Sequence, residues 1–180
     1  GQEEGADILP TGDNAVACTL PSNLPPTALV TGAGRRIGRE IALALANDGL
    51  AVAVHCNTST TEACQVVTEI EARGGKAIVI QANLSREEET CALVSRVIEQ
   101  LGPIGILINN ASTFEYDAID TATRSSWDLH MDANLRAPFV LTQAMAAGLP
   151  PDKQGCIINL IDQRVWNLTP HFITYTLSKA

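Results

Sequence analysis

TALVTGAGRRIG, residues 27–38, is the stretch of sequence that decides the fold. It opens on four residues typical of a buried strand and continues into a run with glycines at positions 32, 34 and 38, where a helical period begins. Glycines between a strand and a helix let the backbone turn sharply and approach a pyrophosphate, which then lies at the positive end of the helix. Because a strand and a helix flank these glycines as the mechanism demands, we predict a dinucleotide-binding loop here.

The sequence after this loop alternates short apolar runs with segments of helical period. Apolar runs bounded by Gly, Pro or polar residues predict parallel strands covered on both faces. Their alternation with helices predicts right-handed crossovers, and therefore an α/β, Rossmann-like doubly wound parallel sheet in three layers. Pro138 either bends or divides the last helix. The predicted strands are 27–31, 51–55, 77–81, 104–109 and 156–161, and the predicted helices are 37–47, 61–73, 86–101 and 127–149.

Length and composition favour one domain over residues 27–180, because 180 residues suffice for one core and hardly for two. Residues 1–26 are acidic, rich in Gly and Pro and without Lys or Arg, so we predict a mobile acidic tail. The net charge of −8 argues against a nucleic-acid partner, and no apolar run is long enough to predict a membrane partner. We therefore expect a small-molecule substrate.

The cysteines and histidines indicate neither a disulfide framework nor a metal site. Five cysteines are scattered and never form a C-x-x-C pair, which favours a reducing, cytoplasmic setting. The three histidines are too far apart in the pattern to predict a shared metal ion. We assign His130 and His171 to ordinary packing or surface positions.

The end of the second predicted strand indicates which dinucleotide binds. Sites for NAD carry an Asp or Glu there that contacts the adenosine ribose, whereas this chain reads Val-His-Cys-Asn-Thr-Ser over residues 54–59. Arg35 and the polar group at 57–59 can hold a 2′-phosphate instead, so we predict NADP(H). The cofactor-binding residues predicted in this half of the chain are Gly32, Gly34, Arg35, Arg36, Ile37, Gly38, His55, Asn57, Thr58 and Ser59.

Tyr175 and Lys179 form a candidate catalytic pair. Side chains four residues apart lie on one helical face, and an ammonium next to a phenol lowers the phenol pKa from its usual value near 10 toward the working range. Alone, this spacing is more typical of a solvated helix face. The pair becomes informative because it follows the fifth strand of a predicted nucleotide-binding sheet.

Taken together, the motifs of this chain resemble the short-chain dehydrogenase/reductase family from about residue 27 to the end. The resemblance rests on the 31–38 loop, Asn-Asn-Ala-Ser at 109–112, Asn134 in Asn-Leu-Arg-Ala-Pro-Phe, and the Tyr-x-x-x-Lys pair, in the family's order. It implies that Tyr175 donates the proton, that Lys179 holds the nicotinamide ribose and lowers the tyrosine pKa, and that Asn134 supports a proton-relay water. It also implies a homotetramer. The further cofactor contacts implied are Asn83, Asn110, Ala111, Ser112, Tyr175 and Lys179.

Two departures from the family pattern narrow the substrate. Asp162 stands where the family has a serine, and Arg36 replaces the middle glycine of the loop. An ionised carboxylate accepts hydrogen bonds and donates none, so Asp162 suits a substrate with N–H groups. With Ser112 and Phe114, these residues resemble the pteridine-reductase branch, which implies that Phe114 stacks on a pterin and that Asp162 and Tyr175 share its protonation. The implied substrate contacts are Arg36, Ser112, Phe114, Asp162 and Tyr175.

The sequence therefore predicts an NADPH-dependent oxidoreductase that transfers hydride to a C=N or C=O group, with a dihydropteridine or dihydrofolate as substrate. Two alternatives stay open: a general ketone or aldehyde reductase, with Asp162 merely paired to Arg164 and Phe114 in the core, and a non-catalytic NADP-binding protein. Members of the family continue past Lys179 with two more strands and a substrate-covering loop. The C-terminal third of the family fold is thus expected to be absent here, and we expect the segment ending at Ala180 to lack reductase activity alone.

Overall fold

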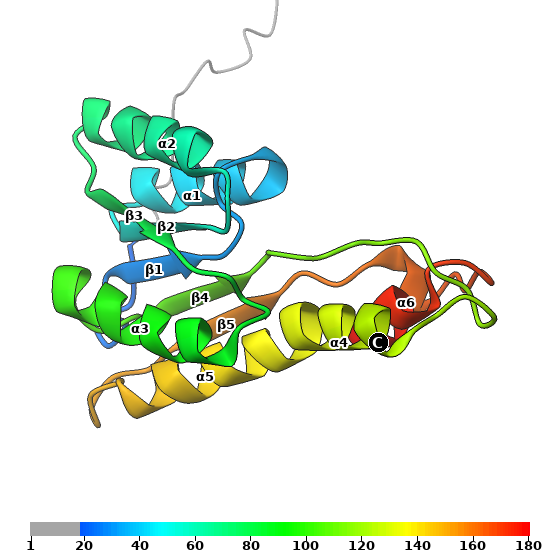
Figure 1. The fold of residues 1–180 in the computed structure, drawn as a ribbon. Helices are drawn as coiled ribbons and strands as arrows, with labels where there is room; N and C mark the ends of the chain where they lie inside the picture. Colours follow the sequence, from blue (N-terminus) through cyan, green and yellow to red (C-terminus); the bar gives the residue numbers. More distant parts are fainter. Residues whose placement is uncertain (1–18) are drawn as a thin grey trace, which may run out of the picture.

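A computed structural model describes residues 19–180, so most of the predicted acidic tail lies outside the described residues. The core is a five-stranded parallel sheet in the order β3-β2-β1-β4-β5 (Figure 1). From β1 the chain adds β2 and β3 on one side, then returns to add β4 and β5 on the other side of β1, as a doubly wound fold requires. The strands are β1 (Thr27–Val30), β2 (Ala51–Cys56), β3 (Ala77–Gln81), β4 (Ile106–Asn109) and β5 (Cys156–Asn159).

Helices cover both faces of the sheet, which confirms the predicted three-layer fold. On one face α1 (Arg36–Asn47) and α2 (Thr60–Ala72) enclose a core that contains Val30, Val52 and Val54. On the other face α3 (Glu87–Leu101) and α5 (Ala137–Ala147) pack over Leu29, Ala53 and Ile80. Figure 1 shows these two helical layers above and below the strands. Within the described residues, none of the helices has the length and apolar character needed to cross a membrane.

The long helix predicted at 127–149 is three segments, and Pro138 is not where it divides. Helix α4 (Arg124–Met131) begins three residues before the predicted start, at a Thr123–Ser126 capping box. It passes into a π-helical segment, η1 (Asp132–Arg136), before α5 begins. Pro138 lies in the first turn of α5, where its missing N–H costs no helical hydrogen bond. The interruption therefore falls on η1, around Asn134.

The prediction that all five strands are buried is wrong for β5. Its four residues are exposed, with Ile157 at 40 % and Ile158 at 48 %. β5 is an edge strand that pairs with β4 alone. The other edge strand, β3, is packed against α2 and α3, whereas the helical layers lie over β1–β4 and leave β5 uncovered. Apolar composition predicts that a strand is suited to burial, but what covers the strand depends on the rest of the fold.

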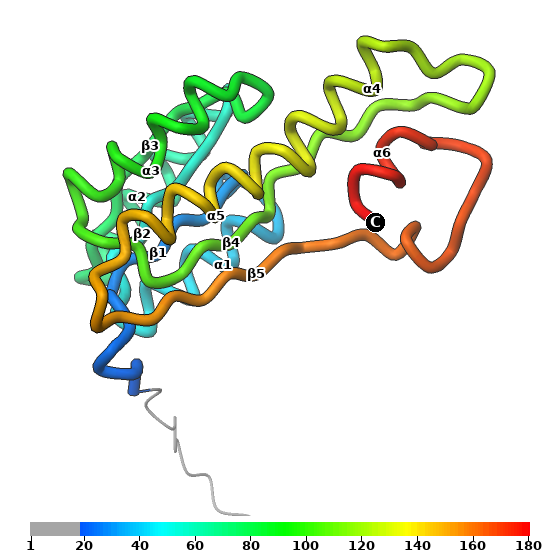
Figure 2. The backbone as a smooth tube through the Cα atoms, turned by 90° about the horizontal axis from the view of Figure 1, so that it is seen from below, coloured from blue at the N-terminus to red at the C-terminus, as the bar shows by residue number. Residues whose placement is uncertain are grey.

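Beyond the carboxyl ends of β4 and β5 two connections run outward and end near each other at α4 and α6 (Ile173–Lys179) (Figure 2). A short 3₁₀ turn, η2 (Gln163–Val165), lies on the second connection. The two are joined by an antiparallel bridge between Ala118 and His171. This projecting part of the molecule carries the predicted catalytic pair.

Candidate functional site

A cleft of about 900 Å³ opens at the carboxyl ends of the strands, where ligands bind in doubly wound sheets. It extends from the loop after β1 to Asp162 beyond β5. The structure thus brings nearly all of the predicted dinucleotide contacts to one cavity. The predicted residues that line it are Gly32, Arg35, Arg36, Ile37, Gly38, His55, Asn57, Thr58, Ser59, Asn83, Asn110, Ala111, Ser112 and Asp162.

The loop after β1 is built from conformations that glycine favours. Gly32 has φ +60°, and a Cβ at Gly38 would collide with the Gly32 carbonyl and the Asn110 amide. Arg36 also has a positive φ, of 51°, although it carries a side chain. Non-glycine residues occupy this left-handed region at some cost in free energy. Arg36 therefore adopts a backbone conformation that glycine favours, and it adds a cation to the lining of the cleft.

The side chains of Asn110 and His55 form hydrogen bonds with the backbone of this loop. The Asn110 amide donates to the carbonyls of Thr31 and Gly32, at 3.0 and 3.1 Å. His55 is buried; its Nδ1 accepts a hydrogen bond from the Gly32 N–H at 3.0 Å, and its Nε2 donates to the Ala82 carbonyl at 2.9 Å. Burial lowers the pKa of His55 from its usual value. Both residues border the cleft, but their polar atoms stabilise the loop.

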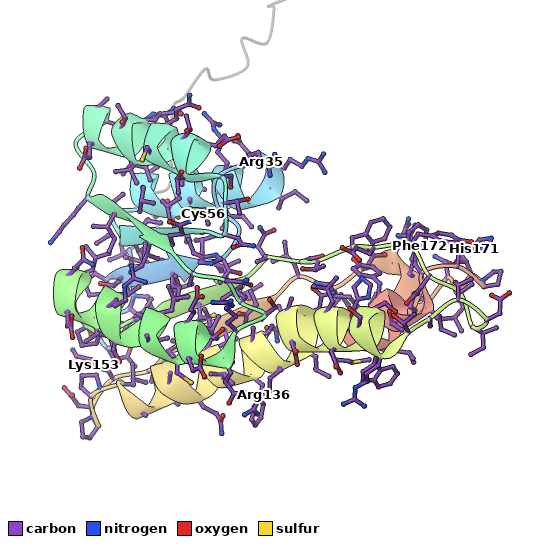
Figure 3. All side chains as sticks on the ribbon, viewed as in Figure 1. Arg35, Cys56, Arg136, Lys153, His171 and Phe172 are labelled. Carbon is purple, nitrogen blue, oxygen red and sulfur yellow. The ribbon has the colours of Figure 1, made fainter. Side chains whose placement is uncertain are left out.

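The end of the cleft at the start of α1 carries positive charge without a carboxylate partner among the described residues. Arg35 and Arg36 are exposed there, and in the described part of the chain neither takes part in an ion pair. Figure 3 shows Arg35 extending outward from this corner. Asn83, which also lines the cleft, accepts hydrogen bonds from Ser85 through Oδ1, so part of its capacity for the predicted cofactor contact is used within the protein.

Asp162 connects this cleft to the catalytic helix. It lines the cavity, and its Oδ2 accepts a hydrogen bond from the Tyr175 hydroxyl at 2.8 Å. Its Oδ1 accepts from the backbone N–H of Arg164 at 2.9 Å, and that bond, more than the opposing effect of burial, keeps the pKa of Asp162 below its usual value. The carboxylate thus stays ionised, in contact with both the cavity and the phenol.

The pKa of Tyr175 is raised, which is the opposite of the direction expected from a neighbouring ammonium. Burial is the main cause and the Asp162 hydrogen bond the second, while Ser112 and Arg164 act in the other direction. Lys179 donates to the Leu160 carbonyl at 3.1 Å, and burial lowers its own pKa. In this arrangement Tyr175 keeps its proton, as a proton donor must.

Phe114, which is predicted to stack on a pterin, lies beside Tyr175 and also belongs to an aromatic stack. Its ring is 4.7 Å from the Tyr175 ring, edge to face, and 4.3 Å from the parallel Phe172 ring. The Arg164 guanidinium lies over both phenylalanines and reaches Asp162 at 3.7 Å. The pairing of Asp162 with Arg164 considered above is therefore present, and it coexists with the contact to Tyr175. Phe172 and His171 mark the outer end of this region in Figure 3.

The Asn134 side chain makes three hydrogen bonds within the protein. Its amide donates to the Thr113 carbonyl and to Ser178 Oγ, at 2.9 and 3.0 Å, and its Oδ1 accepts from the Thr113 N–H at 2.7 Å. Ser178 in turn donates to the Tyr175 carbonyl. Asn134 therefore ties the loop after β4 to α6. Both amide hydrogens are used, so of the side chain only Oδ1, with its second lone pair, remains to hold the predicted relay water.

Sequence reasoning missed the role of three polar residues that are buried where α6 packs against the loop after β4 and α4: Asp117, His130 and, on α6 itself, Thr174. They form one hydrogen-bond chain. No spacing in the sequence marks them, since Asp117 and Thr174 are 57 residues apart. The only available signal was the polar residue directly before the predicted catalytic tyrosine.

With this geometry described, comparison with known proteins decides the family. The model of the short chain dehydrogenase family matches residues 26–180. The chain belongs to that family. It is 42% identical to a solved structure of FolM alternative dihydrofolate reductase 1 from Brucella canis complexed with NADP, with a TM-score of 0.81 over 85% of this chain and 61% of that one.

Two further relatives of the short chain dehydrogenase family carry different names. The chain is 38% identical over 134 residues to the 3-oxoacyl-[acyl-carrier-protein] reductase FabG of Staphylococcus epidermidis, covering 74% of this chain and 55% of that protein. It is 36% identical to a short chain dehydrogenase from Burkholderia cenocepacia in complex with NADP, with a TM-score of 0.80 over 87% of this chain and 64% of that one. The chain thus spans less than two thirds of each relative's length.

Proposed function

We propose that the protein containing this chain is an NADPH-dependent reductase of a dihydropteridine or dihydrofolate, with NADP(H) bound along the cleft between Arg35 and Asp162. The observation that carries the proposal is the Tyr175–Asp162 hydrogen bond at the edge of a dinucleotide-sized cleft. The Brucella relative named as a dihydrofolate reductase and complexed with NADP supports both the substrate and the cofactor.

The residues fit the cofactor. A Cβ at Gly38 would collide with the Gly32 carbonyl and the Asn110 amide, so glycine is needed for the start of α1 to pack this closely against the loop, as in dinucleotide-binding folds. Arg35 and Arg36, which pair with no carboxylate among the described residues, suit a 2′-phosphate, and residues 57–59 directly after β2 hold no carboxylate to repel it. When bound, NADPH supplies the hydride that reduces the substrate carbon.

The protein's own groups supply the proton and the orientation. As hydride reaches the carbon of a C=N bond, the nitrogen gains electron density and takes the proton of the Tyr175 hydroxyl, which leaves C–H and N–H bonds and a phenolate. Lys179 lies on the same helix as Tyr175, and its positive charge stabilises that phenolate. The Asp162 carboxylate accepts a hydrogen bond from a ring N–H and so orients the heterocycle, and solvent returns the proton to Tyr175.

The test is NADPH oxidation by the full-length protein with dihydropterin, dihydrofolate, 3-oxoacyl thioesters and simple ketones, each repeated with NADH. We expect the highest kcat/KM with a pterin or folate, and a strong preference for NADPH. Equal use of NADH and NADPH would contradict the cofactor assignment. Turnover of oxoacyl thioesters alone would favour the second candidate, a ketone reductase, which the similarity to FabG supports.

Two further expectations concern the whole protein. The described cysteines Cys56, Cys64, Cys91 and Cys156 are free thiols, which supports a reducing, cytoplasmic setting. A homotetramer is expected from the family. Light scattering of the full-length protein, with thiol titration of a freshly lysed sample, tests both expectations.

A further inference from the structure

The start of the helix α6 depends on contacts from outside the helix. Phe172, directly before it, adopts a left-handed conformation, φ 57°, and makes no side-chain hydrogen bond to the helix. The first N–H groups of a helix have no acceptor within the helix. The position of Tyr175, in the first turn, is therefore set by the groups that bind α6 from the loop after β4 and from α4.

One such group is a buried hydrogen-bond chain that passes through Thr174, the residue before Tyr175. The Glu115 N–H donates to His130 Nε2 at 3.0 Å, so the ring hydrogen lies on Nδ1 and is donated to Thr174 Oγ1 at 2.7 Å. Thr174 Oγ1 donates in turn to Asp117 Oδ2. The order of donors is fixed along the whole chain, from backbone to imidazole to hydroxyl to carboxylate.

Asp117 closes the chain and also binds the start of α6. Its Oδ1 accepts the Thr174 N–H at 3.2 Å, its carbonyl accepts the Phe172 N–H at 2.7 Å, and its Oδ2 accepts Ser126 Oγ at 3.0 Å. All three chain members are at most 3 % exposed. The His130 ring also lies 6.0 Å from the Tyr175 ring, edge to face, so the chain touches the catalytic side chain directly.

We propose that the Asp117–Thr174–His130 chain positions Tyr175, so that its hydroxyl lies on Asp162 at the edge of the cleft. The Tyr175 ring is then held between His130 and Phe114, and its backbone by Thr174. None of the three touches the cleft, so they are positioning residues that act through Tyr175. This inference rests on the proposed function for its kinetic consequence, but not for its geometry.

The kinetic test uses Thr174→Val, which keeps the side-chain shape and removes the hydroxyl. We expect kcat to fall about 10- to 100-fold, as small displacements of a reacting group do, with the NADPH dissociation constant and KM little changed. Thr174→Ser restores a hydroxyl and should recover most of kcat. Thr90→Val is the matched control, because Thr90 is an equally buried threonine whose hydroxyl bonds to the Leu84 and Arg86 carbonyls, far from α6. Equal losses of kcat in Thr174→Val and Thr90→Val would overturn the proposal.

A second measurement is independent of turnover. Residues 1–180 contain two tyrosines, Tyr116 and Tyr175. In a Tyr116→Phe background, the phenol absorbance near 295 nm minus that of the same protein with Tyr175→Phe therefore isolates the titration of Tyr175. We expect Thr174→Val to lower the Tyr175 pKa toward 10, because the phenol moves away from the Asp162 carboxylate and out of its buried position. An unchanged titration would refute the positioning role. A shifted titration in a protein that reduces none of the tested substrates would leave the positioning role standing and reject the proposed function.

Discussion

The two ends of the cleft are held in place by different kinds of contact. At the end that we propose binds phosphate, backbone groups of neighbouring strands fix the loop: the Thr31 N–H donates to the Ile108 carbonyl and the Ala33 N–H to the His55 carbonyl. The side chains of His55 and Asn110 add to these bonds. At the end that we propose is catalytic, the Tyr175 hydroxyl, ring and backbone are each held by a different segment, largely through side chains. The first arrangement follows mainly from strand pairing, whereas the second depends on long-range polar contacts that a single substitution breaks.

This difference indicates how the two functions can be separated. Substitutions in the catalytic end should change turnover and leave dinucleotide affinity intact. Substitutions in the loop should do the reverse. A protein in which both sets of variants lost both functions together would show that the cleft is one cooperative unit.

The largest separation is expected from Tyr175→Phe. Removing the hydroxyl removes the proton donor, and general acid catalysis of this kind contributes about 10³-fold to the rate. We expect kcat to fall by that order while NADPH affinity, measured by fluorescence titration, stays close to wild type. Tyr116→Phe is the control. It also removes a tyrosine hydroxyl from this cluster of aromatic rings, but that hydroxyl bonds to His171. Retention of wild-type kcat in Tyr175→Phe would remove the basis of the catalytic proposal.

The reverse separation is expected from Gly38→Ala. The new methyl group would collide with the Gly32 carbonyl and the Asn110 amide, which forces the loop to move. Overpacking of this kind costs about 1–3 kcal/mol of folding free energy, and we expect NADPH affinity to fall more than about tenfold, the equivalent of 1.4 kcal/mol. The Tyr175 phenol titration should not change.

Gly105→Ala is the matched control for that loss. Its Cβ would collide with backbone at Pro25, at the opposite end of the sheet from the cleft. It should destabilise the protein in urea to a similar extent and leave the NADPH affinity of the folded protein intact. If both alanine variants lose affinity equally, the effect of Gly38→Ala is one of general stability.

The same contrast explains what could be predicted from sequence. The phosphate loop, the alternation of strands and helices and the Tyr175–Lys179 pair follow from local glycine chemistry and from periodicity, and the structure has them. The exposure of β5, the π-helical η1 and the chain through His130 depend on which segments pack together, and no local pattern encodes that. The prediction that the pKa of Tyr175 is lowered was wrong for the same reason. It was based on Lys179, four residues away in the sequence, but the group bonded to the hydroxyl is Asp162.

The smallest effect, and the one that tests the phosphate end most directly, is the pH dependence due to His55. Burial lowers the pKa of this imidazole in the folded protein below its usual 6.5. At a pH between the lowered pKa and 6.5, the unfolded chain therefore binds a proton that the folded protein does not. Folding stability should therefore decrease as pH falls below about 6.5 toward the folded-state pKa, by at most about 1.4 kcal/mol per pH unit for one group. Paired carboxylates such as Asp162 add a loss of the same sign at lower pH.

A comparison of variants isolates His55 from those carboxylates. Urea unfolding at pH 7.5 and 5.5 should show a larger stability difference for wild type than for His55→Gln, whereas His171→Gln, at an exposed histidine, should behave as wild type. The NADPH affinity of the folded protein should not change until the pH falls to the lowered pKa of His55, because above it the neutral Nδ1 still accepts the Gly32 N–H that shapes the loop. If His55→Gln keeps the full pH dependence of stability, the imidazole is only a packed ring. The phosphate loop would then depend on its backbone contacts and Asn110 alone.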